Sequence, residues 1–457
     1  MDYTYLDPFS YDHDSLSFLG AWCFSKNHRH LLIGKNGNII ILNDNLRNQI
    51  KKQDIGDELW FKLIQRGLAR HSNSIASQVN KNEFAPTFFM IEMTNGCNMR
   101  CHYCSRESFD STGLRTISDN VLESICLFII RYCKNNKISN IAVQPWGGEP
   151  LLQLEKIFKI QDILQSAGIK VSIDIETNGT LLTEKTVSDL HKRSISYGIS
   201  LDGFCKINDL QRRFLDGSGT YNRILKGIEF TKKYYGDNIS ILTTLTKQSI
   251  PYTGEILRFF GEDLGVHKVK MNYVQQSPFT NESDYCVNES DVKKGVTSLF
   301  TELINLNIRD IDIMEYNVWL RMVNILTNRE RDICLSRGCC GGKDMITFDT
   351  EGNFFPCDVT DYPEEKIGDI WSVSDLVEAL VKASNEKSYF TPKKSNSCVN
   401  CPWEHFCKGG CTMRAKCAGS AAGEIDNVDC AINKTLYPMI VELILDKPLL
   451  VTRMVKQ

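Results

Sequence analysis

The sequence predicts an α/β protein with a central partial (β/α)6 TIM-like barrel, a small N-terminal α+β domain before it and a cysteine-rich C-terminal domain after it. Three observations support this division. Apolar strand candidates alternate with helical segments from residue 87 onward. An Asn36-Gly37 pair joins two short apolar runs near the N-terminus, and ten of the 18 cysteines lie between Cys334 and Cys430. The 457 residues, 42% of them apolar, suffice for two or three domains with their own cores.

The N-terminal domain contains the segment HLLIGKNGNIIILN, residues 30–43. Its two apolar runs flank Asn36-Gly37, the strongest short signal for a β-hairpin. Two short helical patterns follow and end near ELWFKLIQRGL, where Gly67 is a plausible helix stop. The polar stretch ARHSNSIASQVNKNEF then predicts a linker. We therefore assign residues 1–85 to this domain and its linker.

Six apolar strand candidates define the barrel, and each is followed by ten or more residues with helical periodicity. They are residues 88–94 (FFMIEMT), 140–146 (NIAVQPW), 170–177 (KVSIDIET), 196–203 (SYGISLDG), 239–246 (ISILTTLT) and 268–274 (KVKMNYV). Strands that are apolar on both faces indicate a parallel sheet covered by helices. The barrel is expected over residues 86–310, a linker helix over 311–333 and the C-terminal domain over 334–457. Active sites on such barrels lie at the C-terminal ends of the strands.

Charge and cysteine content narrow the functional classes. A net charge of −3 gives no general reason to bind nucleic acid or an anionic membrane. The start MDYTYLDPFSYDHD lacks the features of a secretory signal, so a cytoplasmic location is expected. No apolar run reaches the ~18 residues that span a bilayer. In a reducing compartment, clustered cysteines favour metal ligation over disulfides. Five isolated cysteines are expected to be small buried hydrophobes: Cys23, Cys126, Cys133, Cys205 and Cys286.

The loop CNMRCHYC places Cys97, Cys101 and Cys104 directly after the first barrel strand. Three thiolates at this C-x3-C-x2-C spacing suit three corners of a cubane cluster, which leaves one iron without a protein ligand. Zinc ribbons normally use two close ligand pairs. His102 lies inside the loop and could complete a zinc site, so zinc remains an alternative.

The second strand ends in WGGEP, at the same barrel end as the cysteines. Gly147 and Gly148 would let the backbone approach a ligand closely, and Glu149 offers a carboxylate to an ammonium group. Alone, this motif could be a tight turn with a solvated glutamate. Beside the three cysteines, it predicts a site for an amino acid bound to the open iron.

These motifs resemble those of the radical S-adenosylmethionine (radical SAM) enzymes over residues 87–430. The resemblance implies a [4Fe-4S] cluster on Cys97, Cys101 and Cys104. It also implies that the cofactor's amino and carboxylate groups chelate the fourth iron. ETNGTLL at 176–182 and SLDG at 200–203 are similar to the third-strand and fourth-strand motifs, with Arg212, or its neighbour Arg213, as the downstream arginine. The cofactor-binding residues implied are Tyr103, Gly147, Gly148, Glu149, Thr177, Asn178, Ser200, Asp202 and Arg212.

The same resemblance implies the chemistry. A reduced cluster of low potential passes an electron to the sulfonium of S-adenosyl-L-methionine (SAM). Cleavage then yields methionine and a 5'-deoxyadenosyl radical, which abstracts hydrogen from an unactivated carbon. The protein's task is to orient the substrate and to exclude competing reactions.

The C-terminal cysteines resemble a SPASM domain, which carries two auxiliary [4Fe-4S] clusters in many peptide-modifying radical SAM enzymes. The segment CVNCPWEHFCKGGC has the spacing C-x2-C-x5-C-x3-C. The resemblance assigns the first auxiliary cluster to Cys334, Cys340, Cys357 and Cys411. It assigns the second to Cys398, Cys401, Cys407 and Cys430. Cys339 could replace Cys340 as a ligand, Cys417 has no place in the pattern, and two structural zinc sites are the alternative.

The N-terminal hairpin and helices resemble, in size and element order, the winged-helix-like element that binds leader peptides in the maturation of ribosomally synthesised peptides. Such a leader pairs with an exposed strand edge. The alternative is a structural cap on the barrel. The partners expected are a precursor peptide with a leader and an electron donor such as flavodoxin or ferredoxin.

The leading hypothesis is a radical SAM/SPASM maturase that modifies a precursor peptide, by a crosslink or otherwise. One alternative is a maturase of the anaerobic sulfatase-activating type, which acts on a protein side chain. A second is a non-catalytic zinc-binding module. Neither the bond formed nor a catalytic acid or base follows from the sequence, since several Asp, Glu and Tyr residues could face the barrel mouth.

Overall fold

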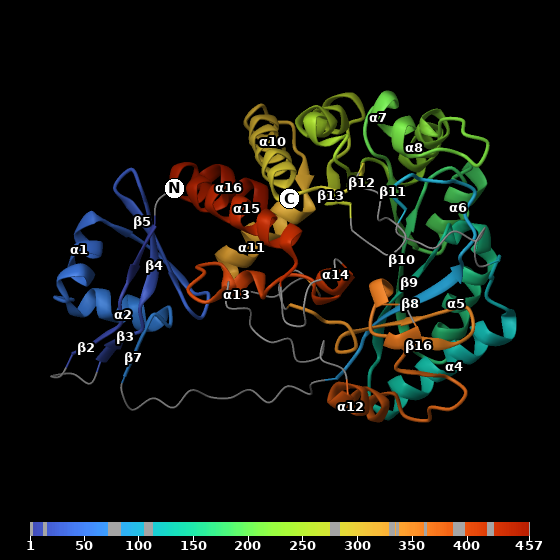
Figure 1. The fold of residues 1–457 in the computed structure, drawn as a ribbon, viewed down its shortest axis with the longest axis horizontal. Helices are drawn as coiled ribbons and strands as arrows, with labels where there is room; N and C mark the ends of the chain where they lie inside the picture. Colours follow the sequence, from blue (N-terminus) through green and yellow to red (C-terminus); the bar gives the residue numbers. More distant parts are fainter. Residues whose placement is uncertain are drawn as a thin grey trace.

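The computed structural model describes residues 3–11, 16–71, 84–104, 113–274, 284–328, 334, 338–360, 363–386, 398–417 and 425–456. Figure 1 shows the N-terminal sheets on one side of the molecule and the barrel strands on the other. The C-terminal helices α15 (Asn427–Asp446) and α16 (Pro448–Lys456) lie between them. No described helix is both long and apolar enough to cross a membrane.

The predicted parallel barrel sheet is present and confirms the fold class. Its six strands are consecutive parallel neighbours: β8 (Phe88–Thr94), β9 (Asn140–Gly147), β10 (Lys170–Thr177), β11 (Ser196–Ser200), β12 (Ser240–Leu245) and β13 (Lys268–Tyr273). The short strand β14 (Met314–Glu315) pairs with β13. All carboxyl ends of a parallel sheet meet at one edge, so the loops after β8, β9, β10 and β11 lie together.

The C-terminal region extends this sheet at its other side. Strand β15 (Met345–Phe348) pairs in parallel with β8, and β16 (Asn353–Phe355) and β17 (Gly368–Asp369) follow in antiparallel order. Pairing between β15 and β8 joins segments that lie far apart in the chain, so sequence periodicity did not predict it. The cysteine-rich region is therefore anchored to the first barrel strand.

Helices cover the convex face of the sheet, and their ends carry regular capping residues. Asn288 forms a capping box with Asp291 at the start of α10 (Glu289–Ile308). Ser118 caps α4 (Asp119–Asn135), and Thr183 caps α6 (Glu184–Lys192). The helical elements here are α4 (Asp119–Asn135), η1 (Pro150–Gln153), α5 (Leu154–Ser166), α6 (Glu184–Lys192), α7 (Cys205–Gln211), α8 (Tyr221–Tyr235), η2 (Ile250–Tyr252), α9 (Thr253–Arg258), the π-helical turn η3 (Phe259–Asp263), α10 (Glu289–Ile308) and α11 (Tyr316–Thr327). Short helices of the C-terminal region are η4 (Asp358–Thr360), η5 (Pro363–Glu365), α12 (Leu376–Glu386), α13 (Glu404–Cys407) and α14 (Thr412–Cys417).

The expectation that the barrel strands are apolar on both faces was wrong for the concave face. Along β10, Val171, Ile173 and Ile175 are buried under the helices, whereas Asp174 and Glu176 on the other face are exposed. A closed barrel fills its interior with layers of side chains. This barrel is incomplete, so water reaches the concave face and polar residues are tolerated there.

The N-terminal domain contains more strands than the single hairpin predicted. One antiparallel sheet has the order β1 (Tyr3–Leu6), β4 (Ala21–Lys26), β5 (Arg29–Gly34) and β6 (Ile39–Asn43). A second consists of β2 (Phe9–Tyr11), β3 (Leu16–Phe18) and β7 (Ala69–His71), and the helices are α1 (Asp44–Lys52) and α2 (Asp57–Gln65). Residues 69–71, expected to begin the linker, instead pair with β3. Residues 72–83 of that linker lie outside the described residues.

One face of the N-terminal sheet belongs to the main core of the molecule. Phe24, Leu31 and Ile33 are fully buried there, and the Phe24 ring stacks on Trp403 at 4.9 Å between centroids. The Arg29 guanidinium donates to the carbonyl of Leu445 on α15 at 2.6 Å. Burial of three large apolar side chains stabilises this contact by roughly 5–9 kcal/mol before ordering costs. The N-terminal domain is therefore a docked part of the fold.

The isolated cysteines divide into two groups. Cys23, Cys126 and Cys133 are buried, as expected for small hydrophobes. Cys205 is exposed at the start of α7 and Cys286 is half-buried, so the expectation was wrong for Cys205. Cys205 is the first residue of α7, and its side chain there is in contact with solvent.

The turn of the predicted hairpin docks against the C-terminal region and gives a stability prediction. Gly37 has φ +76°, and a Cβ there would lie 2.0 Å from His405 Cδ2. Gly37→Ala should lower the free energy of unfolding by about 2–4 kcal/mol, because it adds a clash to an unfavourable backbone conformation. The midpoint of urea unfolding measures this change.

Gly168 provides the matched control. Its φ is +81°, yet no atom lies within 4 Å of the place that a Cβ would take there. Gly168→Ala should cost only about 1 kcal/mol. Equal losses for the two variants would show that the turn does not dock on His405.

Candidate functional site

The cysteine loop is fixed to the end of β9 by close backbone contacts. The amide of Gly148 donates to the Thr94 carbonyl at 2.8 Å, and the amide of Glu149 donates to the Gly96 carbonyl at 3.0 Å. A Cβ at Gly147 would lie 2.1 Å from the Thr94 oxygen, and one at Gly148 would lie 2.2 Å from the Gly96 oxygen. The two glycines therefore admit the backbone of the cysteine loop, in addition to the close approach of a ligand that the sequence predicts.

The three loop cysteines lie in a poorly solvated region. Burial raises the pKa of Cys97 to about 11 and that of Cys101 to about 12, and neighbouring cysteines add to both shifts. Arg212 opposes the shift at Cys101. Thiols in such a place ionise only when a metal centre balances their charge. Within the described part of the chain, no three His, Cys, Asp or Glu side chains have metal-binding geometry, so the ligand sets stay predictions.

Glu149 is buried and held by three donors. The hydroxyl of Thr177 donates to its carboxylate at 2.7 Å, the Asn178 amide at 2.8 Å and the Leu151 amide at 3.1 Å. Burial raises the pKa of Glu149, and these hydrogen bonds oppose that shift. With only 1% of its surface exposed, the side chain is not the solvated turn residue considered as an alternative. Its environment suits a carboxylate that meets a cation.

Asn178 links the third strand to the cysteine loop. Its side-chain amide donates to Asn98 Oδ1 at 2.9 Å and lies 3.8 Å from the sulfur of Cys97. Asn98 in turn donates to the Thr180 hydroxyl at 2.8 Å. The ends of β8, β9 and β10 are thereby joined into one polar site around Cys97.

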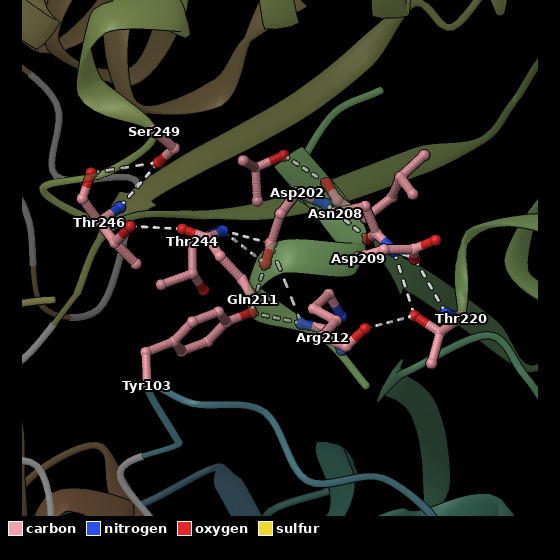
Figure 2. A network of polar contacts seen from close by, with 12 residues as sticks. Tyr103, Asp202, Asn208, Asp209, Gln211, Arg212, Thr220, Thr244, Thr246 and Ser249 are labelled. Atoms are coloured by element: carbon pink, nitrogen blue, oxygen red, sulfur yellow. Dashed lines mark hydrogen bonds and ion pairs between the residues drawn. The ribbon is translucent and has the colours of Figure 1, made fainter. Parts of the chain in front are cut away.

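A second buried network joins Tyr103 to the fourth strand, as Figure 2 shows. The Tyr103 hydroxyl donates to Asp202 Oδ2 at 2.8 Å, and Gln211 Nε2 donates to the same oxygen at 3.0 Å. The Thr244 amide donates to Asp202 Oδ1 at 3.0 Å. Asp202 is completely buried, and burial raises its pKa while Arg212 opposes that shift. Asp202 therefore orients both Tyr103 and the end of α7.

The structure distinguishes the two neighbouring arginines. Arg212 is 6% exposed, donates to the Tyr103 hydroxyl and lies 3.9 Å from Asp202. Its Nε is buried and has no hydrogen-bond partner among the described residues. Arg213 points elsewhere and donates from Nε to the Asp209 carbonyl at 2.9 Å. A buried, unsatisfied donor next to the cysteine loop fits an acceptor supplied by a bound cofactor. Ser200 is half-buried at the end of β11.

Charged residues on the concave face were missed by the sequence argument. Burial raises the pKa of Asp174 and Glu176 on β10, and Lys270 on β13 opposes both shifts. Solvent still reaches both carboxylates, because they lie on the open concave face of the sheet. Asp358, next to Cys357, further raises the pKa of Glu176. The alternation of polar residues in KVSIDIET was the signal that could have revealed this lining.

The four cysteines of the second predicted auxiliary set line a single small cavity. Its walls also include Trp403, Asn433 and Lys434, and its cysteines are Cys398, Cys401, Cys407 and Cys430. Burial raises the pKa of Cys407 to about 11. The structure thus brings all four of these cysteines together from α13, α15 and the loop before α13.

The first predicted auxiliary set lies near the edge of the barrel sheet. Cys340 and Cys357 are buried on either side of the β15–β16 hairpin. Burial is the main cause that raises the pKa of Cys340, and the nearby charge of Cys334 is the second. The charge of Cys339 raises the pKa of both Cys340 and Cys411. Cys339 is therefore close to two members of the set, and the choice between it and Cys340 stays open. The side chain of Cys417 lies outside the described part of the chain.

Comparisons with known proteins identify the central domain. Residues 91–260 match the model of the Radical SAM superfamily. The chain therefore contains a radical SAM domain. The alternative of a non-catalytic zinc-binding module is not supported.

Curated relatives are similar over most of the chain. The cysteine-type anaerobic sulfatase-maturating enzyme of Clostridium perfringens is 26% identical over 70% of this chain and 86% of its own length. The radical SAM cyclopropyl synthase TigE of Paramaledivibacter caminithermalis is 24% identical over 80% of this chain and 76% of its own length.

Solved structures share the fold. Native anSMEcpe with bound AdoMet has a TM-score of 0.67 at 20% identity, and the match covers 79% of this chain and 100% of that one. Streptococcus suis SuiB bound to the precursor peptide SuiA has a TM-score of 0.55 at 17% identity, and the match covers 91% of this chain and 98% of that one. The α/β fold with a mostly parallel central sheet is thus common to all three.

Glu149 gives a prediction about cofactor binding. If its buried carboxylate meets the ammonium group of SAM, Glu149→Gln should weaken SAM binding by about 10-fold to 100-fold, because a charge-assisted contact is lost. Isothermal titration with the anaerobically reconstituted protein measures this affinity. Glu155→Gln, at an exposed position on α5, is the control and should bind normally. Unchanged affinity in Glu149→Gln would remove it from the cofactor site.

Proposed function

We propose that the protein is a radical SAM/SPASM maturase that modifies a ribosomally made precursor peptide, with formation of a crosslink as the leading reaction. The observation that carries this proposal is that one chain contains two separate cysteine sites. The first is the Cys97 loop beside the buried Glu149 and Arg212, and the second is the cavity lined by four cysteines. Relatives that mature sulfatases and form a cyclopropyl group support a peptide or protein substrate. The division into residues 1–85, 86–310, 311–333 and 334–457 is part of the proposal.

The residues have distinct roles in this proposal. A SAM molecule and a [4Fe-4S] cluster at the loop would supply a 5'-deoxyadenosyl radical. Glu149 holds the cofactor's ammonium, Arg212 donates through its free Nε, and Tyr103 is kept in place by Asp202. Glu176 on the concave face of β10, whose pKa is raised by burial and by the charge of Asp358, is the carboxylate we assign to take a substrate proton.

Two auxiliary clusters, an electron donor such as flavodoxin or ferredoxin, and a cytoplasmic location belong to the same proposal. The cavity wall fits a cluster because it presents four thiols. The clustering of the cysteines agrees with metal ligation in a reducing compartment.

A maturase of the sulfatase-activating type is the second candidate, and the 26% identity to the Clostridium perfringens enzyme favours it. That alignment leaves about 30% of this chain unmatched. Incubation of the reduced enzyme with SAM and either a sulfatase peptide or a short peptide encoded beside the gene separates the two. If only the sulfatase peptide changes in mass, the leading proposal is wrong and the protein is a maturase of the sulfatase-activating type.

The cluster assignment predicts the iron content of the protein and how much iron is lost when the loop cysteines are replaced. Anaerobically reconstituted protein should contain about twelve irons per chain. Cys97, Cys101 and Cys104 changed together to Ala should remove about four irons and abolish 5'-deoxyadenosine formation, while the auxiliary iron remains because its ligands lie on other elements. Iron analysis and chromatography of the products measure both. Zinc with little iron, or cleavage retained in the triple variant, would contradict the assignment.

The N-terminal sheet offers a place for a leader peptide. Strand β6 is an edge strand of its sheet, and no described strand pairs with its outer side. Its Ile41 side chain is 39% exposed. An extended peptide can add to such an edge through backbone hydrogen bonds. Because Phe24, Leu31 and Ile33 belong to the shared core, deletion of residues 1–80 would disturb the whole fold, so point variants are the better test.

Proline at Ile40 or Ile41 tests the strand edge. Neighbouring residues of a strand direct their amides to opposite sides, so one of the two prolines removes a donor toward β5 and the other a donor toward the solvent. The outward variant should keep its urea midpoint and lose at least tenfold in leader affinity, measured by fluorescence anisotropy. Ile41→Thr, which keeps the amide, is the control. Full leader affinity in both folded proline variants would favour a structural cap.

A further inference from the structure

One helix face of α15 forms a wall of the four-cysteine cavity. Cys430, Asn433 and Lys434 are spaced i, i+3 and i+4, so they share one side of the helix, and all three line the cavity. Asn433 is only 6% exposed, and its side-chain amide donates to the sulfur of Cys407 at 3.1 Å. The cavity therefore contains an amide donor aimed at one of its four thiols.

A buried arginine fixes the orientation of that amide. Arg321 on α11 is 4% exposed and donates from Nε to Asn433 Oδ1 at 2.7 Å. An Asn amide can be turned by 180° in many structures without contradiction. Here a turned amide would direct its NH2 group at the guanidinium and its oxygen at the sulfur, and both contacts would be unfavourable. The N–H of Asn433 must point at Cys407.

Arg321 is itself anchored to the barrel. Its Nη1 donates to the Asn317 carbonyl at 3.0 Å, and the Asn317 side chain donates to the Met271 carbonyl of β13 at 3.1 Å. Glu315 caps α11 by accepting from the Val318 amide at 2.8 Å and also accepts from the Met271 amide at 2.9 Å. The positive charge of Arg321 therefore sits at a fixed place behind Asn433.

These contacts have a direct electrostatic consequence for an iron–sulfur cluster. One-electron reduction adds a negative charge that spreads over the cluster and its thiolate sulfurs. Amide donors to those sulfurs and nearby cations stabilise the reduced state, so they raise the reduction potential. An anchored amide does so without reorganisation of the protein.

We propose that Asn433, oriented by Arg321, together with Lys434 sets the reduction potential of an iron–sulfur cluster held by Cys398, Cys401, Cys407 and Cys430, and keeps that potential higher than the thiolates alone would. Asn433 and Lys434 are positioning residues that act through the cysteine sulfurs. The inference rests on the proposed function in one respect, that the cavity holds a cluster.

The experiment is a potentiometric titration of the full-length reconstituted enzyme, with dithionite as the electron source and electron paramagnetic resonance as the readout. Cys430→Ala first identifies the signal of this cluster, as the one that is lost or altered. Asn433→Leu keeps the side-chain size and removes the donor. It should lower the midpoint potential of that signal by about 59 mV, a tenfold change in the one-electron equilibrium.

Lys434→Gln removes the cation at an exposed position and should shift the same midpoint in the same direction. It carries the test if the buried Asn433 variant does not fold. Asn307→Leu is the matched control, because Asn307 is fully buried on α10 and its amide donates to the carbonyls of Leu303 and Ile313. That variant should leave the potential unchanged.

The outcomes separate the inference from the proposed function. If Cys430→Ala changes neither the iron content nor any signal, the cavity holds no cluster and the proposed assignment fails. If the cluster is present but its midpoint in the folded Asn433→Leu and Lys434→Gln variants equals that of the wild type, the tuning inference is wrong. A lower midpoint in either variant, with no change in Asn307→Leu, supports it.

Discussion

The close backbone contact between the ends of β8 and β9 is the constraint on which the radical SAM site depends. Hydrogen bonds from Gly148 and Glu149 to the Thr94 and Gly96 carbonyls hold the cysteine loop against the second strand. Any side chain at Gly147 or Gly148 would separate them. Since Glu149 follows directly, the same contact decides where its buried carboxylate lies relative to Cys97. The Tyr103 network then fixes the far end of the loop to β11 and α7.

Local patterns in the sequence predicted the barrel well, because each strand and the helix after it carry their own apolar periodicity. All six strands from β8 to β13 appear at the expected places. The C-x3-C-x2-C loop and the GGEP turn likewise follow strand ends, where chemistry collects on parallel barrels. The two glycines of this turn also approach another backbone segment, which only the fold brings near, and their approach to a ligand stays a prediction.

What the sequence did not reveal depends on contacts between distant segments. The pairing of β15 with β8, and of β7 with β3, leaves no periodic signal in either partner. The sequence analysis expected both faces of each apolar strand to be covered, so it did not predict the polar concave face. Side chains fill the interior of a barrel only when the barrel is closed, and the sequence of one strand does not show that closure. The amide contact from Asn433 to Cys407 joins α15 to α13 and involves a residue type that is common on helix surfaces.

Helix α15 contacts the N-terminal domain, the barrel and the four-cysteine cavity, and so holds these three parts in fixed positions relative to one another. Its C-terminal end accepts hydrogen bonds and ion pairs from Arg29 and Lys26 of the N-terminal domain, its middle packs on α10 of the barrel, and its first turns line the four-cysteine cavity. The N-terminal domain is therefore docked in one position. Under the proposed function, a leader bound at β6 would start from a fixed point, and the length of peptide between leader and barrel would select the residue that is modified.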